Sequence, residues 1–286
     1  MTGPAPQRTG IVAGGGGLPR RLVAACQDHG RPVVVFAFRA ITDPETLIDV
    51  DHVWSRLGGG RAFKRALSAW HVGDLCFAGR FRRPSLLELA PDPVAAAFLI
   101  KVGWRRLGDA RLMDAIVAEL ESLGHRVIAP QAILGDLLSG EGALTKAIPD
   151  DTAWDDILRG QGVARRLGLA DAGQGVVVQQ GVVLAIEAAE GTDSMLARCT
   201  ALRREGPGGV LVKACKPQQD SRMDLPTIGT DTVRAAHAAG LRGIAVEAGA
   251  ALIVGSGEVA ALADALGLFV IGLPQPPQVQ VEPDAP

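Results

Sequence analysis

The chain has 286 residues, of which 48% are hydrophobic and 21% charged, so it can bury a substantial core and is too apolar to be disordered. Lys and Arg number 29 against 31 Asp and Glu, and only 4% of residues are aromatic, which together argue against nucleic-acid binding. The apolar runs are too short to span a membrane, and the first ten residues do not resemble a signal peptide.

Strand and helix patterns alternate along the first half of the chain. Strands are predicted at residues 11–13, 33–38, 51–54, 75–78 and 126–129, and helices at residues 18–29, 61–70, 93–100 and 110–123. This alternation is typical of a parallel, Rossmann-like sheet. Ligands of such sheets bind at the carboxyl ends of the strands, where the loops at residues 14–17 and 79–80 are expected.

The second half shows a different pattern, which predicts a mixed α+β domain. Hairpins are predicted at residues 176–186 and 243–254, single strands at 209–214 and 268–271, and a helix at 231–239. The overall fold class is therefore α/β, with an N-terminal Rossmann-like parallel-sheet domain at residues 1–135. A C-terminal mixed α/β catalytic domain is expected at residues 136–273, and a Pro- and Gln-rich disordered tail at residues 274–286.

A glycine-rich loop follows the first predicted strand. Gly14, Gly15 and Gly16 precede a helix, whose N-terminus and backbone amides attract anions. Pro19 replaces the third glycine of the dinucleotide fingerprint, and no P-loop motif is present, so neither NAD binding nor a P-loop NTPase is expected. Two interpretations stay open: a binding site for a nucleotide or sugar-linked phosphate, and a tight turn that needs glycine only for steric reasons.

Other candidate binding residues lie near predicted strand ends and in the hinge region. Gly79 and Arg80 follow the strand at 75–78, so Arg80 could clamp a phosphate. Lys146 could close on a ligand from the hinge, although a plain surface lysine is the alternative. Glu247 interrupts an apolar stretch and is either a turn residue or a site acid. The four cysteines have no C-x-x-C spacing, which indicates a reducing compartment. Three of them lie in or beside apolar runs and indicate core packing, and Cys215, between two lysines, is expected to be buried next to a strand.

Acidic and basic residues cluster between residues 187 and 229, in a chain that is otherwise rich in Ala, Gly, Leu and Val. The members are Glu187, Glu190, Asp193, Asp220, Asp224, Lys213, Lys216 and Arg222. Carboxylates beside cations suit a hard divalent metal, Mg²⁺ or Mn²⁺, held against phosphate oxygens. Mutual ion pairing in a solvated loop is the alternative. The scattered histidines argue against a zinc site.

The placement of two charged residues suggests how the cluster would assemble. Glu187 follows the strand at 182–186 and Lys213 ends the strand at 209–212, so neighbouring strands would bring both charges to one rim of the sheet. Asp220 and Asp224 could then share a cation with Glu190 or Asp193. Such a site could orient water in line with a phosphorus, and a carboxylate without a cationic partner could accept the water's proton.

Seven blocks of the sequence resemble the metal-dependent UDP-2,3-diacylglucosamine pyrophosphatase family of lipid A biosynthesis. They are I-V-A-G-G-G-G-L-P (11–19), V-D-H-V-W (50–54), F-A-G-R (77–80), L-T-K (144–146), E-A-A-E-G-T-D-S-M-L (187–196), V-K-A-C-K-P-Q-Q-D (212–220) and R-M-D-L-P-T-I-G (222–229). The resemblance extends over roughly residues 10–272 and is specific because the blocks occur together. The glycine run carries one additional glycine at Gly17.

The resemblance implies an enzyme that cleaves UDP-2,3-diacylglucosamine to UMP and 2,3-diacylglucosamine 1-phosphate with Mg²⁺, water attacking the sugar-side phosphorus. It implies two domains that close around the lipid substrate, and a cytoplasmic protein with peripheral membrane contact as an option. Asp224 matches the family's essential acidic position. The matched blocks supply the remaining substrate-binding candidates, Thr192, Gln218, Gln219, Arg222 and Thr227. A non-catalytic carrier and a transferase using the same diphosphate are the rival classes, and a homodimer stays open.

Overall fold

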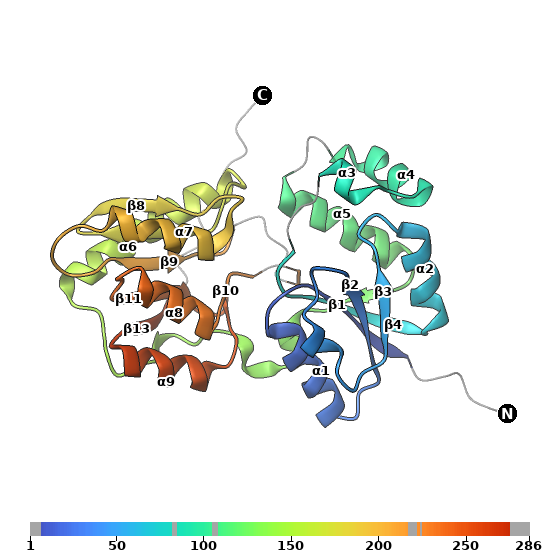
Figure 1. Ribbon diagram of the computed structural model, residues 1–286, viewed down its shortest axis with the longest axis horizontal. Helices are drawn as coiled ribbons and strands as arrows, with labels where there is room; N and C mark the ends of the chain where they lie inside the picture. The colour runs from blue at the N-terminus through green and yellow to red at the C-terminus, as the bar shows by residue number, and fades with distance from the viewer. Residues whose placement is uncertain (1–6, 82–84, 105–107, 217–221, 224, 275–286) are drawn as a thin grey trace. The chain divides into compact units, whose positions relative to one another are not determined.

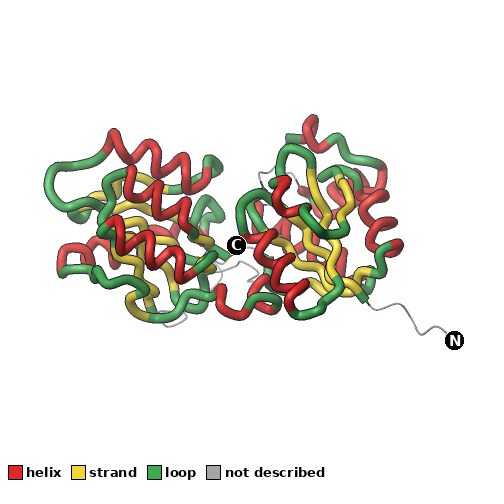
Figure 2. Tube along the Cα trace, turned by 60° about the horizontal axis from the view of Figure 1, so that its bottom comes forward, coloured by secondary structure: helices red, strands yellow, loops and turns green. Residues whose placement is uncertain are grey.

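The computed structural model describes residues 7–81, 85–104, 108–216, 222–223 and 225–274. The chain divides into two compact units, one of Met1–Leu137 with Pro217–Leu225 and one of Leu138–Lys216 with Pro226–Pro286. Each unit has its own sheet, and helices pack on the layer of strands (Figure 2). The predicted α/β fold class is confirmed. Of the tail predicted to be disordered, all but Pro274 lies outside the described residues.

The first unit is built on a five-stranded parallel sheet. Its strands are β1 (Arg8–Ala13), β2 (Val33–Phe38), β3 (His52–Ser55), β4 (Val72–Ala78) and β5 (Arg126–Val127), in the order β3-β2-β1-β4-β5. Its helices are α1 (Leu18–Asp28), α2 (Gly60–Ala69), α3 (Leu86–Leu89), α4 (Pro93–Val102) and α5 (Asp109–Ser122), with a 3₁₀ turn η1 (Pro44–Leu47). The strand order reverses between β1 and β4, and ligands of such sheets bind beside this switch point.

The central strands of this parallel sheet are apolar on both faces, because helices cover the sheet on both sides. Every residue of β2 is buried, as expected for a strand covered on both sides. On one face Phe36 packs in a core with Leu67 of α2 and Leu120 of α5, while α1 contacts β1 and β2 (Figure 1). The Phe36 ring also meets Phe63 edge-on, with ring centroids 5.0 Å apart.

Asp92 organises the start of two helices in this unit. Its carboxylate accepts hydrogen bonds from the Ala95 amide in α4 at 2.9 Å and from the Arg61 amide in α2 at 2.8 Å. These backbone hydrogen bonds, that from Ala95 foremost, lower the pKa of Asp92. The neighbouring Gly58 carbonyl accepts from the Asp92 amide, and a Cβ added at Gly58 would lie 1.9 Å from the Leu89 carbonyl oxygen. The chain can pass here only because residue 58 is glycine.

The second unit contains a six-stranded mixed sheet. Its strands are β6 (Gly142–Ala143), β7 (Gly175–Gln179), β8 (Val182–Ile186), β9 (Val210–Lys213), β11 (Gly243–Glu247) and β13 (Phe269–Leu273), in the order β6-β13-β11-β9-β7-β8. Strands β9, β11 and β13 are parallel, and β7 runs antiparallel to both β8 and β9. A separate parallel pair joins β10 (Thr227–Ile228) to β12 (Leu252–Ile253).

Helices cover both faces of this sheet. They are α6 (Asp151–Leu169), α7 (Gly191–Cys199), α8 (Thr230–Ala238) and α9 (Ser256–Leu266), with a 3₁₀ turn η5 (Thr200–Leu202) directly after α7. Two further 3₁₀ turns, η3 (Pro130–Ala132) and η4 (Gly135–Leu137), belong to the first unit. Helices α7, α8 and α9 share one core with the sheet, and α6 packs on the opposite face (Figure 1). No helix in the described part of the chain has the length and apolar character needed to cross the bilayer.

One of the two predicted hairpins is confirmed and the other is wrong. Strands β7 and β8 form the hairpin predicted at residues 176–186. The stretch at 243–254 is not a hairpin, because β11 pairs in parallel with β9 and β13, whereas β12 pairs with β10. A strand buried between two parallel neighbours is as apolar as a hairpin strand, so the local pattern could not separate the two structures.

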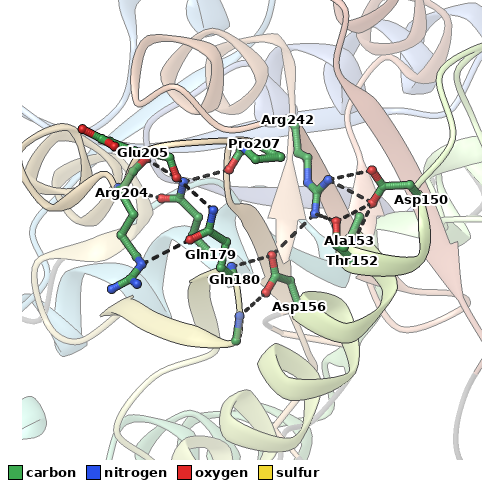
Figure 3. A network of polar contacts seen from close by, with 11 residues as sticks. Asp150, Thr152, Ala153, Asp156, Gln179, Gln180, Arg204, Glu205, Pro207 and Arg242 are labelled. Carbon is green, nitrogen blue, oxygen red and sulfur yellow. Dashed lines mark hydrogen bonds and ion pairs between the residues drawn. The ribbon is translucent and has the colours of Figure 1, made fainter.

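A polar network fixes the turn of the confirmed hairpin (Figure 3). Gln180 and Gly181 both have positive φ, as a two-residue type I′ turn requires. Their amides donate to the buried carboxylate of Asp156 in α6, at 3.1 and 2.7 Å, and Arg242 approaches the same carboxylate at 3.6 Å. The buried Gln179 amide group bonds to the Arg204 and Pro207 carbonyls. The turn is thereby attached to the helix that covers the sheet.

Candidate functional site

Two charged side chains meet at one rim of the sheet in the second unit. Lys213 ends β9 and Glu187 directly follows β8, and the strand between them, β7, begins there with Gly175. Because β7 is antiparallel to both neighbours, β8 and β9 end at the same rim. The Lys213 Nζ atom lies 4.0 Å from Glu187 Oε2. The prediction that these charges meet is confirmed, although the two strands are not adjacent.

Thr192, in the first turn of α7, connects the two charges. Lys213 Nζ donates to Thr192 Oγ1 at 2.7 Å, and Thr192 Oγ1 donates to Glu187 Oε1 at 2.7 Å. Nζ also approaches the Thr227 carbonyl oxygen at 3.5 Å. The side chains of Lys213 and Glu187 are 4% and 9% exposed, so both charged ends of this chain of contacts are buried, and Thr192 between them is half-buried. Glu187 Oε2 has no hydrogen-bond partner within the described residues.

Two glycines make room for Glu187. A Cβ added at Gly175 would lie 2.5 Å from Glu187 Oε2, and one added at Gly173 would lie 1.9 Å from the Glu187 carbonyl oxygen. Contacts this short do not occur for real side chains, so any residue with a Cβ at position 175 would displace the carboxylate. Because Gly175, at the start of β7, has no side chain, the Glu187 carboxylate can extend across this strand toward Lys213.

The other predicted acidic ligands are arranged differently. The Glu190 carboxylate accepts a hydrogen bond from Arg198 at 2.8 Å, and a backbone hydrogen bond within Glu190 and the Arg198 contact lower its pKa. Asp193 is exposed in the first turn of α7. Within the ranges that the structure describes, no three His, Cys, Asp or Glu side chains gather to hold a metal. The described acids therefore do not by themselves fit a metal site. Asp220 and Asp224 lie outside the described residues.

Lys216 and Glu247 have structural partners near this rim. Lys216 Nζ donates to Asp171 Oδ1 at 2.7 Å, and both side chains are mostly buried. Glu247, at the end of β11, accepts from Arg165 Nη2 at 2.7 Å and from the Cys215 amide at 2.9 Å. Glu247 begins a turn, as one interpretation predicted, because its carbonyl oxygen accepts from the Ala250 amide at 3.2 Å, and its side chain is buried. Through Arg165 and Cys215, its carboxylate connects the end of β11 to α6 and to the segment that follows β9.

The glycine loop of the first unit lies at the switch point between β1 and β4. The Gly14 amide donates to the Ala78 carbonyl at 2.8 Å, Gly15 and Arg80 exchange two backbone hydrogen bonds, and the Gly16 amide donates to Asp43 Oδ2 at 2.6 Å. These amides therefore have acceptors within the protein. The pattern favours the steric interpretation of the glycines, and their phosphate-binding role stays a prediction.

Close backbone approach explains two of the glycines. A Cβ at Gly14 would lie 2.6 Å from the Arg80 carbonyl oxygen, and one at Gly79 would lie 2.7 Å from the Gly15 carbonyl oxygen. Gly79 also has a φ of +91°, which L-residues with a side chain rarely adopt. The two predicted binding loops therefore lie against each other. Each loop needs a glycine, Gly14 or Gly79, at the point where it meets the backbone of the other.

The remaining candidates are spread over both units. Arg222 belongs to the first unit, where its guanidinium donates to Glu121 at 2.7 Å. Lys146 lies in the second unit with an exposed side chain, and its amide donates to Asp264. Gln218 and Gln219 lie outside the described residues. Three cysteines are buried as expected, and burial raises the pKa of the Cys76 thiol to about 12, so this thiol is not a nucleophile.

Two residues that shape the rim, Gly175 and Arg165, are not among the predicted site residues. The importance of Gly175 comes from Glu187, which reaches it from the neighbouring strand, so the local sequence gives only an indirect hint. Arg165 lies in a helix and contacts a carboxylate 82 residues later in the chain. The glycine at the start of a buried strand was the available hint for Gly175, since such glycines often mark a close approach of another group.

The chain matches known proteins over almost its whole length. Residues 8–137 match the LpxI N-terminal domain family, and residues 140–271 match the LpxI C-terminal domain family. A protein of Caulobacter vibrioides, UDP-2,3-diacylglucosamine pyrophosphatase LpxI, is 40% identical over 275 residues, which cover 93% of this chain and 98% of that protein. Identity at this level across both units shows common ancestry and a common fold. The chain therefore belongs to the LpxI family.

Proposed function

We propose that this protein hydrolyses UDP-2,3-diacylglucosamine to UMP and 2,3-diacylglucosamine 1-phosphate, a step of lipid A biosynthesis. The observation that carries the proposal is the match along 98% of the Caulobacter pyrophosphatase, which includes both units. The rim of the second sheet supports it, because a lysine held at a strand end supplies the positive charge that a diphosphate requires.

In the proposed reaction a water oxygen forms a bond to the sugar-side phosphorus. The bond from this phosphorus to the bridging oxygen breaks, and its electron pair leaves with UMP. One proton of the water is released to a base, and the remaining O–H becomes part of the sugar phosphate. Lys213 and Lys216 would stabilise charge on the diphosphate. Asp224 is the first candidate for the base, from its position in the matched block, and Asp220 is the second.

Mg²⁺, with Mn²⁺ as the alternative, remains part of the proposal. Asp224, Asp220, Glu190 and Asp193 are the proposed ligands, of which the first two lie outside the described residues. Glu187, the fifth acid of the predicted cluster, contacts Thr192 and lies 4.0 Å from Lys213, and a different role is proposed for it below. A bound divalent ion would reduce the negative charge of the diphosphate. Glu190 would have to exchange its hydrogen bond with Arg198 for a metal contact. The oxygen-rich residue types suit these ions, and the support comes from the family resemblance.

Substrate contacts are proposed for both units. The residues are Gly14, Gly15, Gly16, Gly79, Arg80, Lys146, Thr192, Gln218, Gln219, Arg222 and Thr227.

The protein is proposed to be cytoplasmic, to meet the inner face of the membrane where its lipid substrate resides, and to be able to form a homodimer. Flotation with anionic lipid vesicles and sedimentation equilibrium would measure these two associations directly.

Hydrolysis in ¹⁸O-labelled water tests the reaction and its regiochemistry. Label in 2,3-diacylglucosamine 1-phosphate is the expected result, because the attacked phosphorus keeps the water oxygen. Label in UMP would place the attack on the other phosphorus. Products without label would exclude hydrolysis and favour a transferase, and an absence of any products would favour a carrier.

Substitution of Asp224 tests its assigned role. Asp224→Ala is expected to retain substrate binding and to lower kcat by about 10³-fold or more, as loss of a catalytic group does. The control is Asp231→Ala, which removes an exposed acid in the first turn of α8 and should leave turnover unchanged.

A chelator tests the metal. It should abolish activity, and added Mg²⁺ should restore it. Full activity in the chelator would remove the metal from the proposal.

A further inference from the structure

We propose that Glu187 and Thr192 are positioning residues that hold the Lys213 ammonium for a phosphate oxygen, and that Glu187 is not a ligand of the metal. This inference rests on the proposed function, in which Lys213 stabilises charge on the diphosphate. It deepens that function by assigning separate tasks to two acids of the same cluster, Glu187 and Asp224.

The hydrogen-bond chemistry of the three groups fixes the direction of the contacts. A lysine ammonium only donates, and an ionised carboxylate only accepts. The Thr192 hydroxyl, 2.7 Å from each, must therefore accept from Lys213 and donate to Glu187. A hydroxyl in this position orders both partners, and neither a methyl group nor a second donor could replace it.

The electrostatics of the rim argue against a metal on Glu187. The Lys213 ammonium is the cation that pairs with Glu187 Oε2 in the described part of the chain, 4.0 Å away, and both side chains are buried. A divalent ion bound to the same oxygen would lie beside the ammonium and be repelled in surroundings that screen poorly. Among the described residues, Glu187 belongs to no group of three His, Cys, Asp or Glu side chains that could hold a metal. The ammonium already provides the countercharge that a buried carboxylate needs.

The geometry leaves the ammonium able to act on a ligand. Among the described residues, Nζ makes one short hydrogen bond, to Thr192, and a long contact of 3.5 Å to the Thr227 carbonyl. The separation of 4.0 Å from Glu187 exceeds hydrogen-bond length, so the carboxylate attracts the ammonium without using one of its protons. Lys213 thus keeps donor capacity for a phosphate oxygen while its position at the end of β9 is fixed.

The first experiment separates positioning from metal binding by kinetics. Glu187→Gln and Thr192→Val are expected to lower kcat on the order of 10²-fold with little change in KM, as a misplaced charge does. Thr192→Ser retains the hydroxyl and should restore most of the activity. Gly175→Ala, which pushes on Glu187 Oε2, should reproduce the Glu187→Gln defect. Gly257→Ala in α9 is the matched control, because a Cβ there meets nothing within 4 Å.

The second experiment measures Mn²⁺ binding by electron paramagnetic resonance, without substrate. The dissociation constant for Mn²⁺ should be the same for Glu187→Gln as for the parent protein. A loss of Mn²⁺ affinity of about tenfold or more in Glu187→Gln would identify Glu187 as a ligand and overturn the inference.

A third measurement does not depend on any activity. Nuclear magnetic resonance of ¹⁵N-labelled lysine ammonium groups detects those that are buried and hydrogen-bonded, and the loss of a signal in Lys213→Arg assigns it to Lys213. The signal is expected in the parent protein, Thr192→Ser and Gly257→Ala, and should disappear in Thr192→Val. Its absence from the parent, or its persistence unchanged in both Thr192→Val and Glu187→Gln, would overturn the inference. An inactive parent protein with the expected signals would refute the proposed function alone.

Discussion

Asp74 shows how one carboxylate can connect separate elements of the first unit. It lies in β4 and accepts hydrogen bonds from Arg126 in β5 at 2.7 and 2.9 Å, and from Arg31 at 2.5 Å. The Arg126 hydrogen bond is the main reason that the pKa of Asp74 is lowered. Because the Asp74 side chain is only 18% exposed, this ion pair is screened less than a surface pair would be.

Asp74→Asn is expected to lower the free energy of unfolding of the first unit by about 1.5 kcal/mol at pH 7. The folded pKa is below the unfolded value of roughly 3.9, so the stabilisation is complete above that pH. It is lost as the pH falls through the folded pKa, where the parent carboxyl also becomes neutral. Native-state hydrogen exchange of the β1 and β4 amides at neutral and acid pH would measure the difference.

Asp51→Asn is the matched control. Asp51 also pairs with an arginine, Arg8, at 2.6 Å, but its side chain is 54% exposed. Solvent and salt screen such a pair, so the change should stay within about 0.5 kcal/mol. Equal effects of the two substitutions, or a defect in Asp74→Asn that persists unchanged at acid pH, would contradict the account of Asp74.

At the rim of the second sheet, the sequence predicted some contacts and not others for a physical reason. The meeting of Glu187 and Lys213 could be predicted, because a strand end fixes where a following side chain lies. The acceptor of Arg165 could not, since Glu247 lies in a distant strand and no local pattern links the two. Lys216 pairs with Asp171 in the second unit, and Arg222 pairs with Glu121 in the first, and only the tertiary structure reveals either contact.

At the scale of elements, local patterns predicted most strands and helices and failed where pairing was non-local. The parallel sheet of the first unit followed from regular alternation of strands and helices. The false hairpin at residues 243–254 arose because an apolar run records burial and not the direction of its neighbours. Strand partners of β11 come from distant parts of the chain, so its pairing depends on the assembled sheet.

Helix α6 contains two glycines with opposite expected responses to alanine. A Cβ at Gly160 would lie 2.6 Å from Val212 Cγ2, so Gly160→Ala should overpack the helix–sheet contact and destabilise the second unit by about 1–3 kcal/mol. A Cβ at Gly162 would meet only the end of Arg166, at 3.8 Å. Gly162→Ala should therefore stabilise the helix by about 0.5–1 kcal/mol. Thermal unfolding of both variants gives the comparison, and a change of the same sign in both would refute this packing argument.

At the scale of the whole molecule, the chain does not complete one unit before it starts the other. The first unit includes Pro217–Leu225, which the chain supplies only after most of the second unit. Met223 from this segment is buried in the core with Phe36 and Leu67. The core of the first unit is therefore completed by a residue that follows strands β7 to β9 of the second unit in the chain. A fragment that ends at Leu137 would lack this part of the core.

Two methionines test this division of the chain. Met223 is 9% exposed in the core of the first unit, and Met195 is fully buried in the core of the second. Met223→Ala should destabilise the first unit by about 2–4 kcal/mol, and Met195→Ala should do the same to the second. Hydrogen exchange should accordingly quicken in β1, β2 and β4 for Met223→Ala, and in β7, β9 and β11 for Met195→Ala. If Met223→Ala speeds exchange in the second unit alone, residue 223 stabilises the second unit, and the assignment of Pro217–Leu225 to the first unit is contradicted.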